Sequence, residues 1–307
     1  VTMPAAQPAG DSLAGRVVGT RVFGFSQGER AGRRDDFVRA VLRGALEAQY
    51  RSGMGRADYV DLLAAGSMPE ACRLPQRYRA DWLESYVSRL LGRDLREFSR
   101  LSDPRRLRSL LAGLAAAQGS ETVVARLGGA VNLSASTTTS YMELLRALHL
   151  VERLPPWTPN LLKREVGRSK YLLTDSALAM RLTRTSPDTL KDLVRGGALG
   201  GLLEVFVAAE LMRQSTWCEE RFTISHYRSP DGREIDLILE LDDGRVIAVE
   251  VKAASSASAA DARHLRWLEE RIGDRLVAGV VLTTDDRSRH LGGRLWAVPV
   301  AALWELG

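Results

Sequence analysis

The stretch EIDLILELDDGRVIAVEVKAA, residues 234–254, predicts a β-hairpin that carries charged side chains within otherwise aliphatic strands. Val, Ile and Leu alternate with other residues along both halves, which is typical of paired strands. The DDG sequence at residues 242–244 supplies the turn. Because a buried sheet favours aliphatic side chains, Asp236, Glu250 and Lys252 call for a separate explanation.

The length of the turn decides which side chains face each other across this hairpin. A two-residue loop of Asp243 and Gly244 sets Asp236 opposite Val251 and brings the aliphatic faces of the strands into conflict. A three-residue loop, with Gly244 in the left-handed position of a bulge, sets Asp236 opposite Glu250. We predict the three-residue loop, because it aligns both aliphatic faces. The aliphatic face of the first strand then consists of Ile235, Leu237, Leu239 and Leu241.

Two carboxylates on facing strands predict a cation site, because they repel each other unless a cation or a proton lies between them. Mg²⁺ prefers oxygen ligands and keeps several waters, so Asp236, Glu250 and the main-chain carbonyl of Val251 are the expected ligands. Lys252 would orient a water, or help to deprotonate it, for attack on phosphorus. The alternative is an ion pair between Glu234 and Lys252 on a partly solvated face.

Composition indicates an ordinary globular chain of 307 residues, with 45% hydrophobic and 26% charged residues. At about 100–200 residues per domain, this length favours more than one domain. The net charge of +5 favours a polyanionic partner such as DNA. Lysine is rare beside arginine, which makes each lysine informative. The lysines are Lys163, Lys170, Lys191 and Lys252.

The cysteines and the hydrophobic runs of the sequence bear on the cellular compartment and on membrane association. Cys72 and Cys218 lie far apart without a CxxC pair, so neither a disulfide framework nor a zinc site is expected. No apolar run approaches the ~18 residues of a membrane span, and the first residues do not resemble a signal peptide. We expect a cytoplasmic protein without a membrane partner.

Residues 104–175 predict a winged helix-turn-helix. Three short helices are expected within residues 104–150, followed by two strands within residues 150–157 and 169–175 that form the wing around the loop with Lys163 and Arg164. Residues 134–140 place Ser and Thr at the start of the third helix, where a recognition helix contacts DNA. The alternative is that Ser134 caps this helix and the helix packs against a neighbouring domain.

From residue 196 onward the pattern predicts a compact α/β domain. A helix over residues 199–214 precedes a strand, the hairpin, a second helix and further strands. The second helix connects the strand of Glu250 to the next strand, which favours parallel pairing between the two.

These residues resemble the PD-(D/E)XK nuclease-like superfamily, in which a hairpin carries the Asp and the E-x-K. Asp236 and the sequence Glu250–Val251–Lys252 match that motif, and Glu204 on the preceding helix matches an acidic residue that many members use near the metal. The chain departs from the motif in having no proline directly before Asp236. The resemblance implies catalytic roles for Asp236, Glu250, Lys252 and Glu204.

The whole chain is similar to prokaryotic AAA+-type ATP-binding proteins that end in a C-terminal domain of unknown function. The similarity rests on DSLAGRVVGTRVFGFSQGE at residues 11–29, on GSMPEA at residues 66–71 and on residues 170–260. No G-x-x-x-x-G-K-[ST] loop is present, so we expect the C-terminal portion of such a protein and no ATPase activity by this chain. ATP is expected only in a longer, intact protein.

The expected organisation is multidomain α/β, of the α+β kind. Residues 1–100 are the end of the ATPase domain and its helical lid, residues 101–190 the winged helix, and residues 191–307 the nuclease-like domain. The expected function is a nucleic-acid-associated module with a Mg²⁺-dependent DNA nuclease site. The alternatives are an inactive DNA-binding module or a regulatory protein-interaction module, either of which would form a homo-oligomer or bind a partner ATPase domain.

Overall fold

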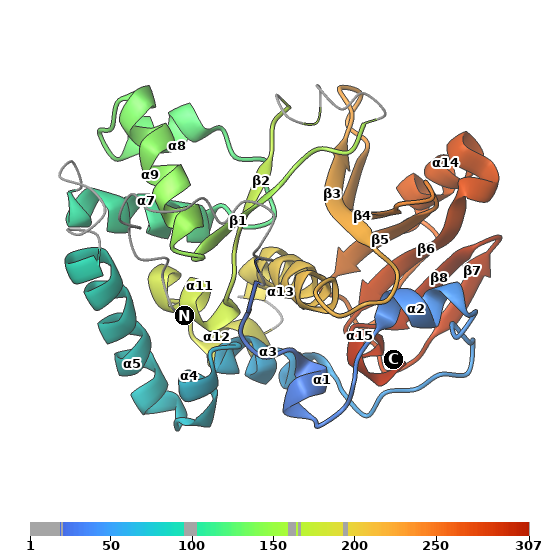
Figure 1. The fold of residues 1–307 in the computed structure, drawn as a ribbon. Coiled ribbons are helices and arrows are strands. Elements are labelled where there is room, and N and C mark those ends of the chain that lie inside the picture. The colour runs from blue at the N-terminus through green and yellow to red at the C-terminus, as the bar shows by residue number, and fades with distance from the viewer. Residues whose placement is uncertain are drawn as a thin grey trace.

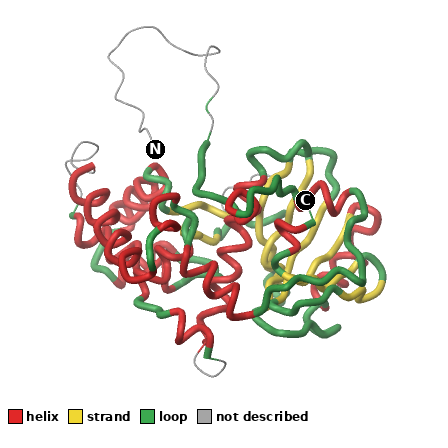
Figure 2. The backbone as a smooth tube through the Cα atoms, turned by 90° about the horizontal axis from the view of Figure 1, so that it is seen from below, coloured by secondary structure: helices red, strands yellow, loops and turns green. Residues whose placement is uncertain are grey.

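Two structural halves flank one central helix in the computed structural model, which describes residues 19, 21–94, 103–158, 164, 167–192 and 196–306. Helices make up one half and a six-stranded sheet the other, with α13 (Leu199–Gln214) between them (Figure 1). Figure 2 shows the same division from below. Residues 11–18, the predicted boundary at residue 100, and Lys163 lie outside the described residues.

The helical half contains a two-stranded hairpin, and its elements over residues 104–173 follow the predicted order. Two short helices, α1 (Gln27–Arg30) and α2 (Phe37–Leu42), precede it in sequence and pack on the sheet side of the molecule. The elements of the helical half are α3 (Arg56–Ala65), α4 (Pro69–Arg73), α5 (Gln76–Arg89), the π-helix η1 (Leu90–Asp94), α7 (Pro104–Ala116), α8 (Val124–Ala130), α9 (Ala135–Ala147), β1 (Val151–Leu154), β2 (Lys170–Leu173), α11 (Ser176–Thr183) and α12 (Pro187–Lys191). Strands β1 and β2 pair antiparallel, with Val151 opposite Leu173. The side-chain oxygen of Ser134 accepts from the main-chain nitrogen of Thr137, so Ser134 caps α9, as the alternative interpretation of this segment predicts.

The sheet of the other half has the strand order β3-β4-β5-β6-β8-β7. Its elements are β3 (Phe222–Arg228), β4 (Glu234–Leu241), β5 (Val246–Lys252), α14 (Arg263–Ile272), the 3₁₀ turn η3 (Gly273–Arg275), β6 (Leu276–Thr283), β7 (Arg289–Gly292), β8 (Leu295–Pro299) and α15 (Ala302–Glu305). Strands β5 and β6 run parallel with α14 between them in sequence, which confirms the predicted crossover. The result is a mixed sheet.

The turn of the β4–β5 hairpin has the predicted three-residue form. Leu241 and Arg245 close the loop through a hydrogen bond of 2.9 Å, and Gly244 adopts a φ of +84°. Leu237 lies opposite Val249. This register confirms the prediction from the turn, because continuing it by one residue sets Asp236 against Glu250.

One part of the hairpin prediction is wrong, because Ile235 does not share a face with Leu237. Leu237 and Leu239 pack in the core beside α13, whereas Ile235 and Ile238 pack in the core beside α14. The cause is a bulge in β4: Ser225 of β3 pairs with Ile238 and Tyr227 pairs with Ile235, which leaves an extra residue on β4. Asp236 lies in this bulge, at the point where the alternation of faces breaks.

Helix α13 is buried almost all round, which its sequence LGGLLEVFVAAELMRQ explains. It contacts β5 on one side and α3 and α11 on the other, while α14 covers the opposite face of the sheet. A continuous apolar core therefore joins the helical half to the sheet through α13. No helix among the described residues, α13 included, combines the length and the apolar character needed to cross a membrane.

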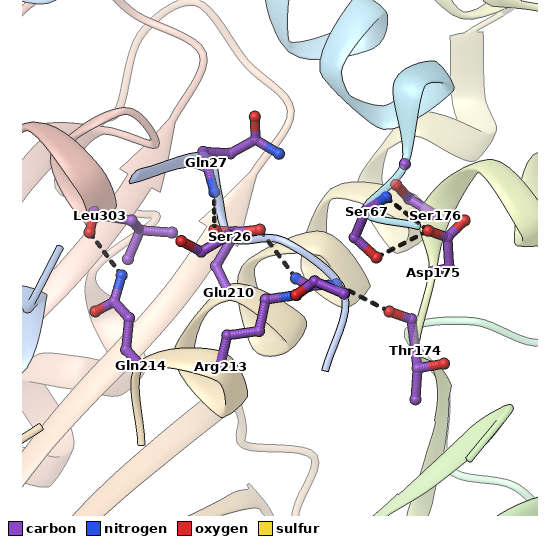
Figure 3. A network of polar contacts seen from close by, with 12 residues as sticks. Ser26, Gln27, Ser67, Thr174, Asp175, Ser176, Glu210, Arg213, Gln214 and Leu303 are labelled. Atoms are coloured by element: carbon purple, nitrogen blue, oxygen red, sulfur yellow. Dashed lines mark hydrogen bonds and ion pairs between the residues drawn. The ribbon is translucent and has the colours of Figure 1, made fainter. Parts of the chain in front are cut away.

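The C-terminal end of α13 carries a buried polar network that holds the segment before α2 (Figure 3). Glu210 accepts from the main-chain nitrogen of Gln27 at 2.9 Å and from Arg213 at 2.9 Å. Gln214 accepts from the main-chain nitrogen of Phe37 and donates to the carbonyl of Leu303. Each side chain of this network joins α13 to a different segment, and so fixes how the segments pack.

Glu210 gives the stability of the fold a specific pH dependence. Burial raises the pKa of Glu210 from 4.5 to about 7, and Arg213 offsets only part of this effect. Because the folded state retains the proton, the stabilisation is complete below pH 4.5 and is lost as the pH rises through 7. Chemical denaturation should show a fall that is smaller in Glu210→Gln than in the wild type by about 1–3 kcal/mol, because the other buried glutamates remain. The exposed control Glu219→Gln should retain the wild-type slope, and identical slopes in all three proteins would contradict the prediction.

Candidate functional site

The three predicted hairpin residues meet at the bulged end of β4 and the end of β5. Asp236 accepts from the main-chain nitrogen of Val251 at 2.8 Å, and Lys252 donates to Glu250 at 2.9 Å. Asp236 and Glu250 are 8% and 3% exposed, whereas the side chain of Lys252 is 36% exposed. Two buried carboxylates therefore lie beside one partly open lysine.

Glu204 of α13 joins this cluster through a residue from the other half of the molecule. Lys170, the first residue of β2, places its Nζ 2.7 Å from Glu204, 3.1 Å from Glu234 and 4.0 Å from Asp236. The side chain of Lys170 is 0% exposed. An ammonium group thus lies among three carboxylates at the boundary between the hairpin and the sheet.

The alternative ion pair between Glu234 and Lys252 is not formed. Glu234 instead contacts Lys170 and, at 3.5 Å, Arg228, while Lys252 pairs with Glu250. The two lysines therefore divide the carboxylates between them, with Lys170 on the α13 side and Lys252 on the open side.

Burial and mutual repulsion alter the acidity of these groups. Burial, followed by the charge of Asp236, raises the pKa of Glu204 and of Glu250 well above the usual value for a glutamate. Burial alone would lower the pKa of Lys170, but Glu204 and Asp236 outweigh it and raise that pKa. The two glutamates therefore hold a proton more readily than an exposed glutamate does, and Lys170 remains an ammonium.

Close backbone packing brings the loop after α7 onto Glu204. A Cβ atom on Gly119 would lie 2.9 Å from a carboxylate oxygen of Glu204 and 3.0 Å from the Cα of Gly201. Gly119 also has a φ of +79°, which disfavours any side chain there. Glycine at this position lets the two halves meet closely enough for Lys170 to reach the carboxylates.

The β1–β2 hairpin is also attached to the sheet through β3. His226 donates its main-chain N–H to the carbonyl of Pro155 at 3.0 Å and accepts from the nitrogen of Trp157 at 2.5 Å. The ring Nε2 of His226 lies 3.1 Å from the carbonyl oxygen of Arg168. His226 therefore contacts the chain after β1 and the chain before β2, and so fixes the strand that begins with Lys170.

The predicted metal ligands of this cluster are all oxygen atoms. Oxygen Oε1 of Glu250 is buried and has no hydrogen-bond partner, which leaves an acceptor available for a ligand. Asp236 and the carbonyl of Val251 are the other predicted ligands, and Asp236 already accepts from the main-chain nitrogen of Val251. Within the residues that the structure describes, no three Asp, Glu, His or Cys side chains gather in a metal-binding arrangement. Glu204 is directed at Lys170, whose ammonium lies close to the atoms that a metal would use.

Sequence reasoning missed Lys170 and His264 as members of this cluster and considered Glu234 only as an alternative partner of Lys252. His264 of α14 lies 4.0 Å from Glu250 and 2.6 Å from the carbonyl of Glu234. The one signal for Lys170 was the rarity of lysine, because Lys170 and Lys252 are two of only four lysines in the chain.

A separate basic cavity of about 400 Å³ lies between α9 and the β1–β2 hairpin. It is lined by Arg146, Arg153 and Arg168 among others, and Glu143 pairs with Arg146 at 3.0 Å. Ser169, which also lines the cavity, accepts from Arg153 at 2.9 Å. The cavity directly adjoins the strand that carries Lys170.

Two family models match adjacent parts of the chain, and the residues of the cluster come from both parts. A domain of unknown function (DUF8612) matches residues 56–189, and a second domain of unknown function (DUF4143) matches residues 199–303. Lys170 therefore belongs to the first matched region, and the carboxylates that surround it belong to the second. No solved structure matches the chain.

Two curated relatives are uncharacterized proteins of mycobacteria, Mb2031c of Mycobacterium bovis and Rv2008c of Mycobacterium tuberculosis. Each is 26% identical over 196 residues, which is 64% of this chain and 43% of the relative. The chain thus spans less than half the length of the curated relatives that it matches.

The charge of Asp236 should add to the effect of burial on the pKa of both buried glutamates. In Asp236→Asn the repulsion disappears, while the amide oxygen still accepts from Val251, so the pKa values of Glu204 and Glu250 should fall toward the usual range. Carboxyl ¹³C NMR of glutamate-labelled protein measures these titrations. Asp242→Asn, in the exposed turn, should leave them unchanged. Unaltered midpoints in Asp236→Asn would contradict the coupling.

Proposed function

We propose that this chain is a nucleic-acid-directed module whose β4–β5 cluster is a Mg²⁺-dependent nuclease site of the PD-(D/E)XK kind, next to a winged helix. The observation that carries the proposal is the meeting of Asp236, Glu250 and Lys252 at a strand bulge, with Glu204 from α13 behind them. The second matched domain is found in C-terminal regions associated with AAA-type ATPases. We therefore infer that a longer protein supplies nucleotide binding.

Each residue has a defined role in this proposal. Asp236, Glu250 and the carbonyl of Val251 would hold Mg²⁺, which stabilises the charge that develops on a phosphodiester under attack by water. Glu204 lies beside Asp236 and supports the acidic character of the site. The bulge in β4 supports the assignment, because bulges commonly redirect a side chain at an active site.

Lys252 would act as an orienting cation. Although burial lowers the pKa of Lys252, the carboxylate of Glu250 outweighs burial and raises it, so the ammonium form persists at neutral pH. A protonated lysine donates hydrogen bonds to a water or to a phosphate oxygen and does not remove a proton. We therefore assign to Lys252 the positioning of water and phosphate.

Metal-dependent cleavage of DNA tests this proposal. With Mg²⁺ or Mn²⁺, Lys252→Ala should cleave DNA at least about 100-fold more slowly than the wild type. Lys191→Ala is a matched control: Lys191 is 35% exposed and paired with Asp61, as Lys252 is 36% exposed and paired with Glu250. Equal cleavage by the wild type and Lys252→Ala, or no cleavage by either, would contradict the nuclease assignment.

A catalytically inactive DNA-binding or interaction module is the second candidate. Two observations favour it: Lys170 neutralises part of the acidic cluster, and the start of α9 presents exposed Ser136, Thr139 and Ser140. The basic cavity beside α9 would bind phosphate groups. Such a module would bind DNA without cutting it, either as a homo-oligomer or beside a partner ATPase domain.

Introducing a negative charge on α9 tests DNA contact independently of cleavage. Ser140→Glu should weaken DNA binding by about tenfold at low salt, because the carboxylate would face phosphates. Ser109→Glu on α7 is the control: both serines are exposed, and each donates to the carbonyl four residues earlier. Fluorescence anisotropy measures both affinities, and equal affinities would rule out α9 as the DNA-binding helix.

A further inference from the structure

We infer that the ammonium group of Lys170 acts as a built-in competitor of the metal ion, so that the site binds a divalent cation more weakly while Lys170 is in place. This inference rests on the proposed metal site. It assigns a regulatory role to a residue outside the nuclease-like domain.

The position of Lys170 supports the inference. Its Nζ contacts Glu204 and Glu234 directly and lies 4.0 Å from Asp236, one of the proposed metal ligands. The ammonium is fully buried, so it is not a surface lysine that solvent would screen. A divalent ion bound by Asp236 would meet a fixed positive charge at close range.

Lysine is chemically suited to such a role. An ammonium group is a compact point charge that satisfies carboxylates with three hydrogen-bond donors, much as a small hard cation does. Lys170 and a metal ion would therefore draw on the same negative charge, and occupancy by one disfavours the other.

Lys170 and the proposed metal ligands belong to different parts of the chain. Asp236 and Glu250 belong to the sheet, whereas Lys170 begins β2 of the other half. Ser169 and Tyr171, its neighbours in sequence, line the basic cavity beside α9. The lysine can thus be changed without altering any proposed metal ligand.

Mn²⁺ binding to the full chain tests the inference without measuring catalysis. The loss of the free Mn²⁺ signal in electron paramagnetic resonance reports binding. Lys170→Met should bind Mn²⁺ at least tenfold more tightly than the wild type, and Lys170→Arg, which retains the charge, should not. The gain should disappear in Lys170→Met/Glu250→Gln, because Glu250 is a proposed ligand.

A second variant keeps the test valid if Lys170→Met does not fold. Lys170→Met leaves buried carboxylates without their cation, so circular dichroism must first show that it is folded. Lys170→Met/Glu204→Gln removes one carboxylate together with the ammonium and should show the same tenfold gain. Mn²⁺ should also raise the melting temperature of either folded variant more than that of the wild type.

The outcomes separate this inference from the nuclease proposal. Equal Mn²⁺ affinity in the wild type and the Lys170 variants, or a gain that survives Glu250→Gln, overturns the role of Lys170 even if DNA is cleaved. Tighter Mn²⁺ binding that depends on Glu250 supports the role of Lys170, even if no variant cuts DNA and the nuclease proposal fails.

Discussion

The contact of the Lys170 ammonium with Glu204 and Glu234 is the interaction on which the arrangement of the two halves depends. It crosses from the β1–β2 hairpin to α13 and β4. Buried charges are tolerated only when they are paired, because an isolated buried charge costs several kcal/mol. The hairpin cannot shift by a few ångströms without leaving both the lysine and the carboxylates uncompensated. Gly119, packed on Glu204, is needed for the same close approach.

Helix α13 extends this constraint through the rest of the fold. Its apolar side chains lie in the core shared by both halves, while Glu204 and Glu210 form buried polar contacts at separate points along it. The first contacts the hairpin and the second contacts the segment before α2. Apolar burial supplies the driving force for packing, whereas these directional contacts determine which segments pack and in what register.

The sequence predicted those features that depend on local chemistry. Gly244 determined the turn and hence the register of Asp236 and Glu250, and the hydrophobic pattern predicted the helices, the hairpin strands and the parallel crossover. The bulge at Asp236 escaped prediction because it depends on pairing with β3, which no pattern within β4 specifies. Lys170 escaped because it is 34 residues from Glu204 in sequence, and nothing local to either residue indicates the other.

The two polar clusters on α13 differ in a way that bears on function. In the cluster of Glu210, both carboxylate oxygens are hydrogen-bonded, as expected of a structural network. At the cluster around Asp236, four carboxylates contact Lys170, Lys252 and Arg228, and Oε1 of Glu250 is buried without a partner. A buried polar atom without a partner costs about 1–3 kcal/mol, and the Glu210 network also contains one, the side-chain nitrogen of Gln27. The two orphans differ in kind: a nitrogen donor cannot hold a cation, whereas the carboxylate oxygen of Glu250 can, and this difference is why the cluster around Asp236 and Glu250 is the one proposed as a binding site.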